Sequence, residues 1–122
     1  MNASERDKQA KKTLTVIERH ARSMGTNNPK TIAADYAEDA VVMGTIFSKT
    51  VIGRDDVETS VAELLKNSTG GTAVSDIRML KHEAVGEYGY LVFESDTFAG
   101  TETYVVRNGS IAFESCTSYP KT

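Results

Sequence analysis

The last third of the chain, Leu91 to Tyr119, constrains the fold more than any other stretch. It contains three runs rich in β-branched and aromatic residues, separated by Ala99-Gly100 and by Arg107-Asn108-Gly109. Such runs favour strands, and short segments with glycine or asparagine favour tight turns between antiparallel strands. The stretch is therefore predicted to form a curved antiparallel meander, and the upstream residues must supply helices that cover one of its faces.

Length and composition indicate one globular domain over residues 1–122. The 122 residues are 39% hydrophobic and 25% charged with a net charge of −3, which suffices for one core and leaves no basic surface for nucleic acid. The single cysteine, Cys116, excludes an internal disulfide and suits a reducing compartment. The first twelve residues are charged and no apolar core follows them. We therefore expect neither a secretory signal nor a membrane span, and a cytoplasmic location.

Three helices are predicted before the meander. Ser4 is a candidate cap for the first, which ends near Met24 and carries its apolar stripe at Leu14, Ile17, Ala21 and Met24. Asn28-Pro29 suits the start of the second, because asparagine caps helices and proline fits the first turn. The second helix is expected to place Tyr36 on its covered side. The expected ranges are residues 4–24, 29–39 and 55–67.

Two short strands are predicted between the second and third helices, at Ala40–Met43 and at Thr50–Gly53. A long strand at Ala73–Ala84 is expected after the third helix, following a turn at residues 67–71. The loop between the first two carries Ile46 and Phe47. Bulky apolar residues in a loop are explained if the loop folds over a pocket or a partner.

This order of elements resembles the nuclear transport factor 2-like superfamily, the cone-shaped α+β folds that include ketosteroid isomerase and the SnoaL-like polyketide cyclases. The resemblance rests on Val16–Gly44, Ile52–Leu65 and Tyr104–Phe113 and covers nearly the whole chain. It implies a cystatin-like curved, mixed or antiparallel sheet wrapped around three helices, with a blind cavity on the concave side. It does not imply one activity, because this fold hosts enzymes as well as transport and assembly domains.

The predicted turns assign residues to faces of the sheet. A three-residue loop at 107–109 pairs Val106 with Ser110 and sets Glu102 opposite Glu114. The cavity face then carries Glu102, Tyr104, Val106, Ala112, Glu114 and Cys116, joined by Leu91, Phe93, Ser95 and Thr97. The other face carries Val92, Phe98, Val105, Ile111 and Phe113. Because both faces are partly apolar and the helices cover only one, we expect a homodimer through the outer face of the sheet.

Two carboxylates and one histidine are the candidate catalytic residues. If Glu102 and Glu114 share the cavity, repulsion raises one pKa and yields an acid and a base near neutral pH. His20, beside the stripe of the first helix, titrates near neutrality and suits a proton relay. The alternatives stay open: both carboxylates at a wet rim or facing outward, and His20 as an edge residue bonded to a backbone carbonyl or water.

Laying the chain over ketosteroid isomerase tests the resemblance by residue. The oxyanion-hole tyrosine of that enzyme falls on His20, its strand aspartate falls near Glu102, and its general base falls on Gly44. Without a carboxylate at the base position, true ketosteroid isomerase activity is not expected. Asp39, in a motif common in the superfamily, is interpreted as structural.

No metal, nucleotide or other cofactor is predicted. His82 and Cys116 have no second ligand at metal-binding spacing, and Gly70-Gly71 opens a strand rather than a helix. Cys116 as a nucleophile would need His20 as its base, whereas a buried structural cysteine is the commoner case.

Two classes of function remain open. One is a cofactor-independent acid-base enzyme (isomerase, cyclase or dehydratase) for a hydrophobic small molecule, using His20, Glu102 and Glu114. The pocket walls expected for such an enzyme are Tyr36, Phe47, Phe93, Tyr104 and Cys116. The other is a non-catalytic dimeric binding or assembly module, whose cavity holds a ligand or is filled by side chains.

Overall fold

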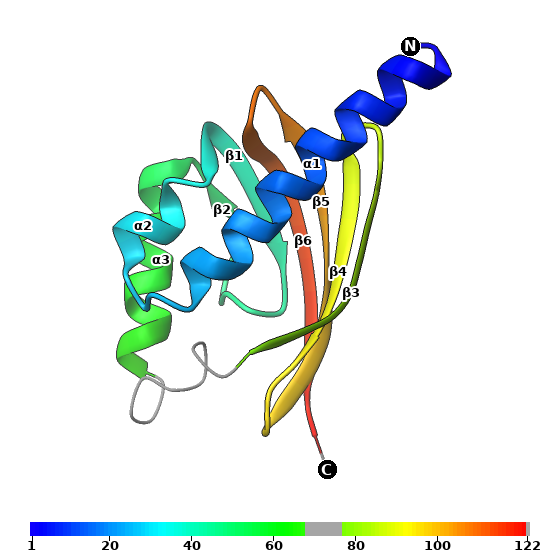
Figure 1. Ribbon diagram of the computed structural model, residues 1–122. Helices are drawn as coiled ribbons and strands as arrows, with labels where there is room; N and C mark the ends of the chain where they lie inside the picture. The colour runs from blue at the N-terminus through cyan, green and yellow to red at the C-terminus, as the bar shows by residue number, and fades with distance from the viewer. Residues whose placement is uncertain (68–76, 122) are drawn as a thin grey trace.

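In the computed structural model, which describes residues 1–67 and 77–121, helices lie on one side of a curved six-stranded sheet that does not close into a barrel (Figure 1). The predicted α+β class is confirmed. The elements are α1 Ala3–Met24, α2 Pro29–Ala33, β1 Tyr36–Gly44, β2 Val51–Ile52, α3 Arg54–Asn67, β3 Arg78–Val85, β4 Tyr88–Glu94, β5 Phe98–Arg107 and β6 Ser110–Pro120.

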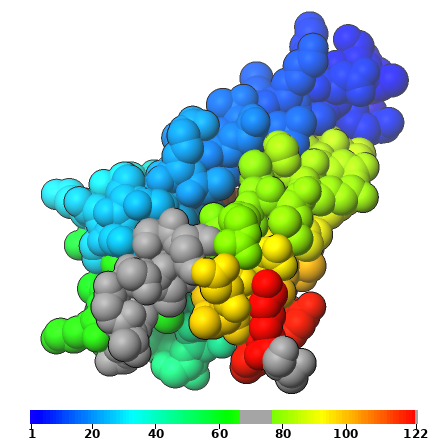
Figure 2. All heavy atoms as spheres, turned by 60° about the horizontal axis from the view of Figure 1, so that its bottom comes forward, coloured from blue at the N-terminus to red at the C-terminus, as the bar shows by residue number. Residues whose placement is uncertain are grey.

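The sheet is mixed, with strand order β2-β1-β6-β5-β4-β3. Strands β3 to β6 form an antiparallel meander, as predicted, and β1 adds to it in parallel with β6. Helix α1 crosses the concave side and packs against β3, β4 and β5, while α3 packs against α2, β1 and β2. Figure 2, seen from the end where the C-terminus lies, shows α1 directly beside β3. The concave side is therefore a covered interior.

Helix α1 begins one residue before its predicted start, and its buried face is rotated from the predicted stripe. Its N-cap is Asn2, whose side chain accepts a hydrogen bond from the Glu5 amide, so the prediction of Ser4 as cap was wrong. Of the predicted stripe only Ile17 is fully buried. The buried residues are Thr13, Val16, Ile17, His20 and Ser23. His20 therefore lies at the centre of the buried face rather than at its edge.

Helix α2 starts as predicted but is much shorter. Asn28 caps it by accepting hydrogen bonds from the Lys30 and Thr31 amides, with Pro29 in the first turn. The helix ends at Ala33, so the prediction of a helix to residue 39 was wrong. The Ile111 amide donates to the Asp35 carbonyl, and Tyr36 is already paired with Ile111. The chain gains sheet hydrogen bonds there that a continued helix would forgo.

Helix α3 and strand β2 follow the prediction closely, whereas β1 begins at Tyr36, before the predicted start at Ala40. Helix α3 begins at Arg54, so Asp55 lies in its first turn, where its charge complements the helix dipole. The predicted turn at residues 67–71 reaches beyond the described residues, as does the first part of the strand predicted at 73–84; its described part is β3. In the described parts of the chain, no helix is both long and apolar enough to cross a membrane.

The first predicted hairpin turn was misplaced, and the second has its predicted place but is one residue shorter. The first lies at residues 95–97, where the Ser95 hydroxyl accepts from the Thr97 and Phe98 amides; Ala99-Gly100 is inside β5. The second is a two-residue turn of Asn108 and Gly109, with φ angles of 52° and 77°. Close to this turn, the pairing of β5 with β6 has a register irregularity between Val105 and Val106.

The irregularity changes the register and the faces. Glu102 pairs with Cys116, and Tyr104 pairs with Glu114, so the predicted pairing of Glu102 with Glu114 was wrong. Ile111 is fully buried opposite Val106 and does not lie on the outer face. Phe98 also turns inward and packs edge-on against Phe93, with ring centroids 5.9 Å apart. Glu102 and Glu114 remain diagonal neighbours on adjacent strands, which is close enough for long side chains to meet.

Candidate active site

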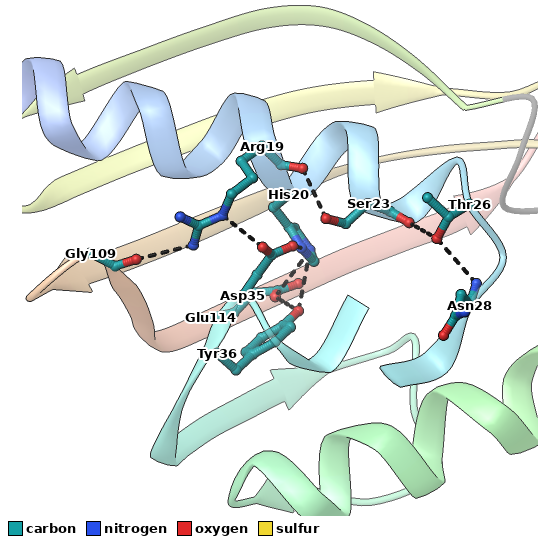
Figure 3. A network of polar contacts seen from close by, with 9 residues as sticks. All are labelled: Arg19, His20, Ser23, Thr26, Asn28, Asp35, Tyr36, Gly109 and Glu114. Carbon is teal, nitrogen blue, oxygen red and sulfur yellow. Dashed lines mark hydrogen bonds and ion pairs between the residues drawn. The ribbon is translucent and has the colours of Figure 1, made fainter. Parts of the chain in front are cut away.

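A buried polar cluster lies where α1 crosses the start of β1 and the middle of β6 (Figure 3). His20, which is 1% exposed, points from α1 toward Asp35, Tyr36 and Glu114. Its Nδ1 lies 3.1 Å from Asp35 Oδ2, and its Nε2 lies 3.3 Å from the Tyr36 hydroxyl and 4.0 Å from Glu114 Oε1. Next to the Asp35 carboxylate, Nδ1 is the ring nitrogen that donates a proton, and in the neutral form of the ring Nε2 then presents its lone pair to the cluster.

Asp35 is the residue that positions this histidine. It lies between α2 and β1, and Arg19 donates to its other oxygen over 2.8 Å. The Arg19 guanidinium also donates to the Gly109 carbonyl over 3.0 Å. Burial alone would raise the pKa of Asp35, but hydrogen bonds from His20 and Ser23, and then from Arg19, lower it below its usual value. Asp35 therefore stays ionised and holds His20 in one tautomer.

Neither Asp35 nor Arg19 was predicted from the sequence as a site residue. A signal was present, because Asp35 is the one acid in the otherwise apolar run from Ile32 to Ala37. An acid at such a position is a candidate for a buried, paired group. The partner could not be read from the sequence, since Arg19 and His20 reach Asp35 only through the packing of α1 against α2 and β1.

Tyr36 and Glu114 form the second half of the cluster. The Tyr36 hydroxyl donates to Glu114 Oε1, and both side chains are buried. Burial, then the nearby charge of Glu102, raises the pKa of Glu114 well above its usual range. The folded protein therefore favours the protonated, neutral form of Glu114, which is the state of a general acid.

Glu102, Tyr104 and Cys116 surround this pair on β5 and β6. One ligand atom each from His20, Glu102 and Glu114 lie within 4.8 Å of one another, a spacing that admits a shared proton or a small cation. The Tyr104 hydroxyl is buried and has no hydrogen-bond partner among the described residues. Burial, then the charges of Glu102 and Glu114, raises the pKa of Cys116 far above its usual value, which disfavours a thiolate nucleophile.

A narrow cavity of about 50 Å³ leads to the cluster. His20 and Glu102 are its polar lining residues, and the remaining walls are apolar. Those walls are Ala21, Met24, Ile46, Ile77, Met79, Leu91 and Phe93. Of the residues expected as walls, Phe93 lines this cavity, whereas Tyr36, Tyr104 and Cys116 are buried outside its lining. Phe47 lies in a separate surface cleft with Lys49 and Glu63.

Two other positions from the sequence analysis carry no chemistry here. Gly44 has a φ of 128°, and a Cβ there would lie 1.8 Å from the Cys116 carbonyl oxygen. The position that the resemblance assigns to a general base therefore admits no side chain. Asp39 is exposed on β1 rather than at a helix end, away from the buried cluster.

Comparison with known proteins finds likeness in structure rather than in sequence. No protein-family model matches the chain, and no curated protein matches it. Among solved structures, a putative ketosteroid isomerase from Kribbella flavida is 14% identical, with a TM-score of 0.72 over 93% of this chain and 82% of that chain.

Two further structures show the range of proteins that share the architecture. An epoxide hydrolase of the LEH-like type from Mycobacterium tuberculosis is 12% identical, with a TM-score of 0.67 over 90% of this chain and 84% of that one. A ketosteroid isomerase-like protein from Catenulispora acidiphila, solved in complex with trimethylamine, is 12% identical, with a TM-score of 0.68 over 83% and 82%. At such identities the likeness establishes the fold alone, and the resemblance inferred from the sequence is confirmed at that level.

Proposed function

Because this chain has the nuclear transport factor 2-like fold, we propose that it binds a small molecule in the cavity between α1 and the sheet and moves a proton on it. The fold is compatible with many functions, so the proposal depends on the site. The observation that supports it is that His20 and Glu102 line an otherwise apolar cavity, with Glu114 close behind them. Buried ionisable groups that converge in an apolar pocket are typical of acid-base sites.

In this proposal the three groups divide the proton transfer. His20 is the general base, because Asp35 holds its Nδ1 proton and leaves Nε2 free to accept another. Glu114, kept neutral by burial, is the acid, and Glu102 exchanges a proton with it. No cofactor is required for a reaction of this kind.

The size of the cavity limits what enters it. A volume of about 50 Å³ lies well below the roughly 300 Å³ or more of a pocket that encloses a drug-sized ligand. Only a head group of a few atoms, such as a carbonyl, reaches His20 and Glu102 without movement of the walls. We expect a larger apolar body to displace Met24 and Met79, whose unbranched side chains adapt readily.

Proton exchange in D₂O tests the proposal without knowledge of the natural substrate. Small ketones such as cyclopentanone exchange their α-protons when a base abstracts them, and NMR follows the loss of signal. We expect the protein to accelerate this exchange, and Glu102→Gln and His20→Gln to reduce it at least about tenfold. Glu94→Gln, on the exposed side of β4, is the control. Equal rates with and without folded protein would refute proton transfer to these probes.

A non-catalytic binding or assembly module is the second candidate, and the small cavity favours it. In that case the cluster of His20, Asp35, Tyr36 and Glu114 serves to order the interior. The two candidates differ in one measurement, since a structural cluster gives no exchange above background.

Either candidate is compatible with a homodimer, which we propose forms through the outer face of the sheet. Val92, Val105 and Phe113 are half-buried there, and Val85 and Tyr88 are 59% and 60% exposed. An apolar sheet face of this kind is normally covered. Sedimentation velocity should find a dimer that Val105→Lys converts to a monomer, while Glu58→Lys on the exposed side of α3 leaves it intact. A monomeric parent protein would refute the dimer and leave the cavity proposal standing.

A further inference from the structure

The buried cluster has more hydrogen-bond acceptors than donors. Its acceptors are Nε2 of His20 and the four carboxyl oxygens of Glu102 and Glu114. Its donors are the hydroxyls of Tyr36 and Tyr104, each with one hydrogen, and the acid proton of Glu114 when that group is neutral. The Tyr36 hydrogen is directed to Glu114, although Nε2 of His20 is also within 3.3 Å of the same oxygen. At least two acceptors therefore receive no hydrogen from this set of donors, and Glu102, which carries two of the carboxyl oxygens, is half-buried in the lining of the cavity.

Among the described residues, the cluster also lacks a permanent positive charge beside Glu102 and Glu114. Arg19 pairs with Asp35, and His20, which lies 4.0 Å from Glu114, is charged only when it is protonated. In the described parts of the chain, no lysine or arginine forms an ion pair with Glu102 or Glu114. Buried carboxylates are ordinarily paired or neutralised.

Tyr104 provides an independent observation. Its hydroxyl is buried without a partner among the described residues, in a side chain that is 2% exposed. The ring packs edge-on against His20, with centroids 6.0 Å apart, and burial followed by the charges of Glu102 and Glu114 raises its pKa. Tyr104 does not line the cavity itself, so it acts on a ligand there through its neighbour Glu102, whose side chain does line the cavity.

We infer that the head group recognised in this cavity is a primary ammonium on a short apolar chain. This inference rests on the proposed function, because it takes the same cavity as the ligand site. An ammonium brings three N–H donors and one positive charge, which is what the cluster lacks. Leu91, Phe93 and Met24 would contact the chain, and the cavity of about 50 Å³ suits a head group of this size.

The same contacts would begin the chemistry. Transfer of one ammonium proton to Nε2 of His20 breaks an N–H bond of the ligand and leaves its electron pair on nitrogen. The imidazole becomes a cation stabilised by Asp35, and the ligand becomes a neutral amine nucleophile. No further reactant is needed for this step.

Binding of four matched small probes tests the inference. The effects of charge, hydrogen-bond donors and apolar volume are separated by comparing n-propylammonium, 1-propanol, propionate and tetramethylammonium. Calorimetry gives stoichiometry and affinity, and the methyl NMR signals of Met24 and Met79 report whether the probe is in the cavity. We expect n-propylammonium to bind one-to-one, at least about tenfold more tightly than each of the other three.

Variants locate the binding. Glu102→Gln should weaken n-propylammonium at least about tenfold, and Tyr104→Phe should weaken it severalfold while keeping the core packed. Glu38→Gln is the matched control, because Glu38 lies in an acidic surface cleft with Asp55 and Asp56, where a cation attracted by charge alone would bind. If Glu102→Gln fails to fold, the affinity of Tyr104→Phe for n-propylammonium still tests the inference.

Four outcomes would overturn the inference. They are tetramethylammonium binding as tightly as n-propylammonium, 1-propanol binding as tightly, loss of binding only in Glu38→Gln, and Zn²⁺ or Mn²⁺ binding one-to-one through Glu102 while n-propylammonium does not bind. Binding of 1-propanol at the methionines without preference for the ammonium removes this inference and leaves the proposed function intact. Failure of every probe to reach the methionines, together with no proton exchange, removes both.

Discussion

Two tyrosine–carboxylate pairs lie on opposite faces of the same sheet and differ in burial. Tyr36 donates to Glu114 on the concave side of the sheet, where both side chains are buried. Tyr90 donates to Glu83 over 2.6 Å on the outer face, where the pair is exposed. Water can satisfy the polar groups of the outer pair but not those of the buried inner pair. Loss of the hydrogen bond is therefore expected to cost more free energy in the inner pair than in the outer pair.

The two histidines repeat the comparison. His20 is 1% exposed and bonds Asp35 over 3.1 Å, whereas the His82 side chain is 29% exposed and lies 3.7 Å from Glu18. Both are histidine–acid pairs that include a residue of α1. Only the first pair is desolvated and held by a third group, Arg19, so only the first is shielded from exchange with water.

The largest difference between the two settings is expected for the acids that pair with histidine. Asp35→Ala removes the partner of a buried histidine and of Arg19, and should lower the free energy of unfolding by about 3–5 kcal/mol. Glu18→Ala should cause no measurable loss, because its pair is solvated. Urea denaturation of both variants measures the difference. Equal losses would show that burial does not set the strength of these pairs.

The two tyrosines should show a smaller difference. Tyr36→Phe leaves the Glu114 carboxyl without its donor in the interior and should lower stability by about 1–3 kcal/mol. Tyr90→Phe should have no measurable effect, because water can satisfy Glu83. The same denaturation experiment applies. A neutral Tyr36→Phe would mean that Glu114 finds another donor.

The pH dependence of stability should separate the two glutamates. The raised pKa of Glu114 means that the folded state holds its proton when the unfolded chain has released it. The contribution of Glu114 to the free energy of unfolding is complete below its pKa in the unfolded chain, near 4.5. This contribution is lost as the pH rises through the raised pKa of the folded protein, at up to about 1.4 kcal/mol per pH unit.

Glu114→Gln should remove that slope, and Glu83→Gln should leave it unchanged. The groups around Glu114 that are common to wild type and variant are His20 on α1, Asp35, Tyr36 on β1, Glu102 and Tyr104 on β5, and Cys116 on β6. Unfolding curves between pH 5 and pH 9 give the difference directly. Parallel pH profiles for wild type and Glu114→Gln would refute a retained proton.

The smallest difference is expected for the arginines. Arg19→Met loses a pair to Asp35 and a bond to Gly109, but the Arg19 side chain is 41% exposed, so a loss of about 0.5–1 kcal/mol is expected. Arg107→Met, which breaks the exposed pair with Glu87, should give no measurable change. Thermal unfolding of both variants provides the measurement. A loss above that of Asp35→Ala would show that Arg19 has a role beyond holding Asp35.

Much of the fold could be predicted because its signals are local. The cap at Asn28 with Pro29, the length of α3 and the β-rich final third depend on neighbouring residues. The register of β5 and β6 could not be predicted, because a register irregularity between Val105 and Val106 shifts their pairing. Because side chains alternate between the two faces of a strand, a register shift of one residue moves Ile111 from the predicted outer face to the buried face.

The residue types of the site were determined by the sequence, which carries one histidine near the stripe of the first helix and two glutamates on the last two strands. Their meeting was decided by tertiary structure. Asp35 joined them because the backbone of Asp35 and Tyr36 bonds to Ile111 of β6 instead of continuing a helix. The physical reason is that protonation and pairing depend on desolvation and on neighbours far apart along the chain, which only packing brings together.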